Sequence, residues 1–93
     1  MYERIFWRLR NLILLRQYVM TLHAEEEMDA DALTVFDVES CILTGKIHQR
    51  QKDRNTGEYK YRIRGVSLDA RKLEVVAKLG PTEKVVIITV YLV

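Results

Sequence analysis

The chain has 93 residues, 48% of them hydrophobic and 30% charged, so it has the size of one small domain, residues 1–93, and enough apolar side chains for a core. This balance excludes a disordered chain, and the apolar runs are far shorter than the ~20 residues of a membrane-spanning helix. The single cysteine, Cys41, cannot form an intramolecular disulfide, and the chain shows no secretory leader. We therefore expect a cytoplasmic protein without a membrane role.

The formal net charge is only +2, but the charges are unevenly distributed along the chain. Residues 1–22 carry +3, residues 23–39 carry −7, residues 40–72 carry +6 and residues 73–93 carry no net charge. This order of charges predicts a folded molecule with a strongly polar distribution of charge, and which face is basic depends on how the middle third of the chain folds.

The first third of the chain predicts two helices. Apolar residues recur at helical spacing over residues 2–16, and arginines occupy the remaining arc. Residues 17–22 include β-branched and aromatic residues. We expect either a short extended link, which we favour, or a continuation into the next helix. Residues 23–32 are rich in Ala and Glu and are expected to be helical.

A third helix is predicted to begin at Thr34, because Thr34 and Asp37 have capping-box spacing. Cys41 belongs to the apolar stripe of this helix, so a buried thiol is the better interpretation than a metal ligand or a nucleophile. Gly45 falls where a left-handed helix stop is expected.

After Gly45 the pattern changes to four strands, at residues 46–51, 59–66, 72–79 and 84–93. Turn residues separate the first two at Asn55, Thr56 and Gly57, and residues 80–83 separate the last two. The last strand is apolar on both alternating sets, so we expect it to be central in the sheet or covered by a partner chain. The predicted fold class is α+β, with the N-terminal helices packed on a four-stranded antiparallel sheet.

Four segments, "TLHAEEEM", "FDVESCILTGKI", "RQKDRNTGEYKYRIRG" and "VVIITVYLV", resemble in order and spacing the domain-of-unknown-function family DUF4258. Members of that family have a helix, a "T-x-HA-x-x-R-M" segment, a helix ending in "G-x-I", a strand containing tyrosine and a terminal "IITVY". The resemblance implies a fold related to the small RelE-like and barnase-like toxins, in which helices pack on an antiparallel sheet whose surface cleaves RNA.

The resemblance places the family's histidine at His23, its strand tyrosine at Tyr61, and its terminal threonine and tyrosine at Thr89 and Tyr91. The chain departs from the family at Glu27, where members usually have an arginine. A carboxylate there would repel phosphate, which suggests a degenerate or retargeted copy as an alternative to an active one.

Metal-independent RNA cleavage needs a base for the 2′-hydroxyl proton, an acid for the leaving oxygen and cations near the phosphorane. Our candidate catalytic residues are His23, Tyr91 and Arg62. His23 has a structural alternative, in which it bonds a backbone carbonyl or Tyr91 at the start of its helix. His48 is either a solvated strand residue or the group opposite His23.

The segment from Lys46 to Arg64 has seven bases and two acids, interleaved with tyrosines. This composition suits phosphate contact with base stacking, although basic hairpins at a sheet edge also serve solubility. By strand alternation, Arg62 and Arg64 face one side of their strand and Tyr61 the other. The candidate RNA-binding residues are Lys46, Arg50, Lys52, Arg54, Lys60, Tyr61 and Arg64.

We expect no metal and no other cofactor, because no metal-binding motif is present. The function implied by the resemblance is the toxin of a toxin–antitoxin pair, a metal-independent endoribonuclease whose partners are RNA and an antitoxin encoded nearby. The alternatives are a non-catalytic RNA- or protein-binding module, and a homodimer without further activity.

Overall fold

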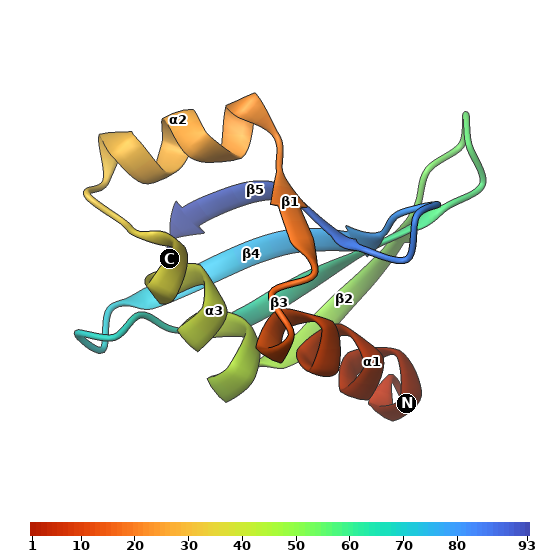
Figure 1. The fold of residues 1–93 in the computed structure, drawn as a ribbon, viewed down its shortest axis with the longest axis horizontal. Coiled ribbons are helices and arrows are strands. Elements are labelled where there is room, and N and C mark those ends of the chain that lie inside the picture. The colour runs from red at the N-terminus through yellow and green to blue at the C-terminus, as the bar shows by residue number, and fades with distance from the viewer.

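The computed structural model describes residues 1–93 and contains three helices and one five-stranded sheet (Figure 1). In chain order the elements are α1 (Glu3–Leu14), β1 (Tyr18–Met20), α2 (Leu22–Ala30), α3 (Val35–Thr44), β2 (Lys46–Lys52), β3 (Tyr59–Val66), β4 (Lys72–Leu79) and β5 (Val85–Leu92). The predicted α+β class is confirmed.

The strand order is β1-β5-β4-β3-β2, and β1 runs parallel to β5 while the other pairs are antiparallel. The prediction of a four-stranded, purely antiparallel sheet was therefore wrong. The missed strand lies within residues 17–22, which we had interpreted as an extended link. A three-residue strand has no detectable period of its own, and its partner lies at the other end of the chain.

β5 is an internal strand, as its apolar sequence predicts, because it pairs with β4 on one side and β1 on the other. β1 pairs only with Val85–Ile87, and the rest of the β5 edge contacts α2. The Thr21 hydroxyl donates to the Ile88 carbonyl (3.0 Å), and the Glu27 carboxylate accepts from the Val90 amide (3.1 Å). These contacts satisfy backbone groups that an open sheet edge would leave unpaired.

The helices α1 and α3 pack on the same face of the sheet, and α2 lies along its β5 edge (Figure 1). The core between these layers includes Leu9, Ile42, Ile63, Val75 and Ile87, none more than marginally exposed. Strand alternation places a different set of side chains on the opposite face of β2 to β5, which we call the open face. It includes Lys46, His48, Lys60, Arg62, Arg64, Glu74, Val76, Lys78, Thr89 and Tyr91.

The backbone of α3 lies unusually close to β3. A methyl group built at Gly65 would come 2.1 Å from the Cys41 carbonyl oxygen, and one at Gly45 would come 2.2 Å from the Arg64 carbonyl oxygen. Gly45 itself has an extended backbone (φ −94°, ψ −166°), so the predicted left-handed helix stop was wrong. Glycine is required at position 45 because the backbone of β3 passes too close for a side chain. The end of α3 is bonded by Arg10, which donates to the Gly45 carbonyl (2.7 Å).

We predict that Gly65→Ala lowers the free energy of unfolding by about 3 kcal/mol, because rigid backbone atoms leave no room for a methyl group. Gly57→Ala is the matched control. Gly57 has φ +75° in open space, so its substitution should cost only about 1 kcal/mol through backbone strain. Urea unfolding measures both, and equal losses would contradict the close approach of α3.

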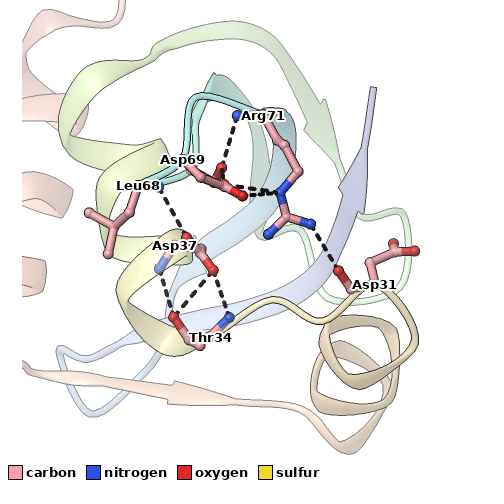
Figure 2. A network of polar contacts seen from close by, with 7 residues as sticks. Asp31, Thr34, Asp37, Leu68, Asp69 and Arg71 are labelled. Atoms are coloured by element: carbon pink, nitrogen blue, oxygen red, sulfur yellow. Dashed lines mark hydrogen bonds and ion pairs between the residues drawn. The ribbon is translucent and has the colours of Figure 1, made fainter.

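The start of α3 is bound to the β3–β4 loop by a polar network (Figure 2). Thr34 and Asp37 form the predicted capping box, and the second Asp37 oxygen accepts from the Leu68 amide (3.0 Å). Arg71 pairs with Asp69 (3.0 Å) and donates to the Asp31 carbonyl (3.0 Å). The loop therefore joins the end of α2 to the start of α3.

Hydrogen bonds from the Thr34 and Leu68 amides lower the pKa of Asp37 below its ordinary value of 3.8. A carboxyl group with a lowered pKa in the folded state stabilises the fold above its unfolded pKa and loses this contribution as the pH falls through the folded value. We predict that Asp37→Asn costs about 1 kcal/mol at pH 7 and that its difference from the parent shrinks below pH ~4. Urea unfolding at several pH values, with exposed Asp29→Asn as control, tests this; a pH-independent difference would contradict it.

Candidate functional site

A buried carboxylate organises the open face. The Glu74 side chain has 0% exposure, although it lies on the face that α1 and α3 leave uncovered. Its Oε1 accepts from Arg64 Nε (2.9 Å) and lies 3.2 Å from His48 Nε2, and its Oε2 accepts from Arg62 Nη1 (3.4 Å). We call these four residues the Glu74 cluster.

The strand register explains why these side chains meet. Arg64 lies directly opposite Glu74 in the β3–β4 pair, and Arg62 is two residues away on the same side of β3. His48 sits where the β2–β3 register shifts between Ile47 and Gln49. This bulge allows His48 to reach across β3 to Glu74, and bulges commonly redirect a side chain in this way.

The Glu74 cluster carries a net positive charge. Two guanidinium groups and one carboxylate give +1, and a protonated His48 would give +2. The Arg62 and Arg64 side chains remain 40% and 54% exposed, so their outer N–H groups can still reach a ligand. Arg62 Nε is buried without a hydrogen-bond partner. The cluster can therefore bind an oxyanion while Glu74 holds both guanidinium groups in place.

Tyr91 lies beside this cluster. It is opposite Glu74 in the β4–β5 pair, on the far side from Arg64, and Thr89 is opposite Val76 in the next row. Both are half-buried on the open face. The structure therefore brings two of the three predicted catalytic residues, Tyr91 and Arg62, to one surface.

His23 does not reach that surface through a direct contact. Its side chain is 66% exposed on α2, and its Nε2 lies 3.2 Å from Glu27 Oε1, the same oxygen that accepts from the Val90 amide. The structural alternative for His23 predicted a bond to a backbone carbonyl or to Tyr91. His23 makes neither of these bonds and contacts Glu27 instead. Its catalytic role stays a prediction, and Glu27 has a structural role that an arginine could not fill, because a guanidinium group has no acceptor.

The candidate RNA-binding residues divide between the two faces of the β2–β3 hairpin. Lys46, Lys60 and Arg64 share the open face with Arg62. The remaining cations lie elsewhere: Arg50 and Lys52 are paired with Tyr61 and Tyr59 on the other face, and Arg54 is exposed at the hairpin tip. The predicted basic hairpin therefore carries its cations on two surfaces.

Tyr61 belongs to the core and cannot serve as a surface stacking residue. It is only 7% exposed, its ring packs edge-on against Tyr2, and burial raises its pKa. Cys41 is also buried, as predicted, with its thiol directed at the Ile63 and Leu73 carbonyls. Burial raises the pKa of Cys41 to about 12, which leaves it without thiolate character at neutral pH.

Next to the cluster, the open face is hollowed by a depression of about 280 Å³ between β3, β4 and β5. Its charged residues are balanced, with Lys60 and Lys78 facing Asp53 and Glu58, and Lys78 pairs with Glu58 (3.2 Å). On the open face, the excess positive charge therefore lies outside this depression, at the Glu74 cluster and Lys46. No group of three or more His, Cys, Asp or Glu side chains is placed to hold a metal ion.

Sequence reasoning missed Glu74 and gave His48 a lesser role. The sequence did contain a signal for Glu74, because it is the only acid in the apolar strand at residues 72–79. An antiparallel neighbour carrying Arg62 and Arg64 would place arginines close to it. The bulge at His48 had no comparable signal, because no glycine or proline marks it.

The match to a family model covers residues 20–92 and therefore includes α2, α3 and β2 to β5, with only the last residue of β1. The chain belongs to the DUF4258 family, a domain of unknown function. Searches of curated proteins and of solved structures each found no match to this DUF4258 chain. None of its helices is both long and apolar enough to cross a membrane.

We predict that removing the cations leaves the buried Glu74 carboxylate uncompensated. Arg64→Ala should lower the free energy of unfolding by about 2 kcal/mol, and the Arg62→Ala/Arg64→Ala double variant by about 3–5 kcal/mol. Arg54→Ala, an exposed cation at the hairpin tip, is the control and should stay within about 0.5 kcal/mol of the parent. A double variant as stable as the parent in urea would show that Glu74 does not depend on these arginines.

Proposed function

We propose that this DUF4258 chain has a RelE-like toxin fold and is a metal-independent endoribonuclease that uses the open face of its sheet. The observation that carries this proposal is the Glu74 cluster with Tyr91 in the adjacent strand. It combines an anion-binding pair of guanidinium groups with two side chains that can transfer protons, His48 and Tyr91, on one exposed surface.

The residues fit the needs of RNA transesterification. Arg62 and Arg64 would bind the scissile phosphate and stabilise the charge of the phosphorane. His48, 37% exposed and oriented by Glu74, would exchange a proton with the 2′-hydroxyl or the leaving oxygen, and Tyr91 would take the opposite role. Glu74 acts as a positioning residue, because its carboxylate is buried beneath the cations.

His23 remains the second candidate histidine in this proposal. It lies on α2, which packs along the β5 edge of the sheet, whereas His48 lies on β2 at the other edge and contacts Glu74 directly. Only one of the two needs to serve as the proton-transfer partner of Tyr91, so substituting each separately distinguishes them.

A non-catalytic RNA-binding module is the second candidate function. Two observations favour it. Arg62 and Arg64 both donate to Glu74, and the His23 ring contacts the Glu27 carboxylate. In either case the partner expected for a toxin is an antitoxin with an acidic segment, which would fit the cations of the open face. A second copy of this chain, offering its acidic α2, is the homodimeric alternative.

The test is cleavage of a mixed RNA by the purified chain in the presence of a chelator, scored by 2′,3′-cyclic phosphate ends. His48→Ala should lower the rate by about 10²-fold or more, because loss of a general acid or base typically costs this much. Tyr91→Phe should also lower it, and exposed Lys84→Gln should not.

Loss of cleavage in His23→Ala with retention in His48→Ala would move the proton-transfer role to His23. RNA binding without cleavage by the folded parent would support the binding module and contradict the ribonuclease. No RNA binding at any salt concentration would leave only the protein-partner and homodimer alternatives.

A further inference from the structure

The second basic surface of the β2–β3 hairpin contains an arginine between two tyrosines. The Arg50 guanidinium carbon lies 4.3 Å from the ring centroid of Tyr59 and 5.9 Å from that of Tyr2, and Lys52 Nζ lies 5.9 Å from the Tyr59 ring. Tyr59 is 39% exposed, although it is large and apolar. We call Tyr2, Arg50, Lys52 and Tyr59 the tyrosine–arginine surface.

We propose that the tyrosine–arginine surface is a second binding site for single-stranded RNA, separate from the open face and adjacent to it around the β2 edge. This inference rests on the proposed function, because it extends the RNA contact of the same molecule. It assigns Arg50, Lys52 and Tyr59 to a surface that the Glu74 cluster does not include.

The chemistry of the surface matches unpaired nucleotides. Bases stack on aromatic rings and on guanidinium planes, at about 1–3 kcal/mol per base, and lysine and arginine attract the backbone phosphates. Because stacking needs bases that are not already stacked in a duplex, the expected ligand is single-stranded. Arg50 is positioned by its two rings, which reduces the entropy lost when it contacts RNA.

The position of the surface gives a continuous path to the open face. Arg50 and Lys52 alternate along β2 with Gln49 and Gln51, which are paired with Arg62 and Lys60 of the open face. β2 is an edge strand, and its hairpin extends past the rest of the sheet (Figure 1). A strand of RNA can therefore pass around this edge from one face to the other, beside Tyr2 at the start of α1.

The nearby acids do not neutralise this surface. Asp53 accepts hydrogen bonds from the Asn55 and Thr56 amides in the hairpin loop, and Glu58 pairs with Lys78 on the open face. Glu3 pairs with the N-terminal ammonium group of Met1 (2.7 Å). Arg50 and Lys52 thus remain available to phosphate.

The experiment measures binding of labelled 2′-O-methyl RNAs of about 12 and about 3 nucleotides by fluorescence anisotropy. The methylated 2′-oxygen prevents cleavage, so binding is measured alone. Tyr59→Leu should weaken binding of the longer RNA by about tenfold, the loss of one stacked base. Tyr59→Phe keeps the ring and should stay near the parent, and Lys84→Gln controls for an exposed charge elsewhere.

Arg50→Gln should lower the slope of log affinity against log salt by about 0.7, the value for one phosphate contact to a single strand. The short RNA can occupy the open face without reaching the tyrosine–arginine surface, so both substitutions should weaken its binding less than that of the longer RNA. Longer RNA bound equally by the parent, Tyr59→Leu and Arg50→Gln, with all three folded by circular dichroism, would overturn the second site.

The two proposals fail in different ways. A parent that cleaves unmodified RNA but shows no dependence on Tyr59 retains the ribonuclease and loses this site. A parent that never cleaves but binds the longer RNA through Tyr59 retains this site and loses the ribonuclease. A parent that binds neither RNA overturns both.

Discussion

The buried carboxylate of Glu74 is the constraint on which the open face depends. A charged group without solvent contact is tolerated only when cations and hydrogen bonds replace its water. Arg64, Arg62 and His48 supply these contacts from two neighbouring strands. The same contacts orient their side chains, so the requirement to compensate Glu74 also assembles a preorganised set of cations. The residues that stabilise Glu74 are therefore the same ones on which the proposed function depends.

Much of the fold was predictable because it follows local rules. Helical spacing located α1, the Thr34–Asp37 spacing located the start of α3, and alternation along residues 59–66 assigned Arg62 and Arg64 to one face. The errors arose where long-range contacts decide the structure. β1 exists only because it pairs with the distant β5, and Gly45 is glycine because Arg64 passes close to it, which no local pattern reveals.

The candidate site was less predictable for a related reason. Strand alternation could assign the β3 side chains to faces, but the Glu74 cluster also depends on register across three strands and on the bulge at His48. The bulge changes which β2 residues share a face with β3, so a count of bases along the hairpin cannot separate Arg50 from Lys46. The register is what assigns the basic residues of the hairpin to two surfaces.

The distribution of charge across the sheet separates Glu27 from the basic residues of the open face. Acidic α2 covers the β5 edge, and Glu27 bonds the Val90 amide there, whereas the cations lie toward β2 and β3. If RNA binds the open face, repulsion from α2 disfavours a path across the β5 edge and attraction favours the β2 edge. The acid that departs from the family pattern then lies outside the phosphate-binding region. Its presence is compatible with catalysis at the Glu74 cluster, because the cations that would contact phosphate come from β3 and do not depend on α2.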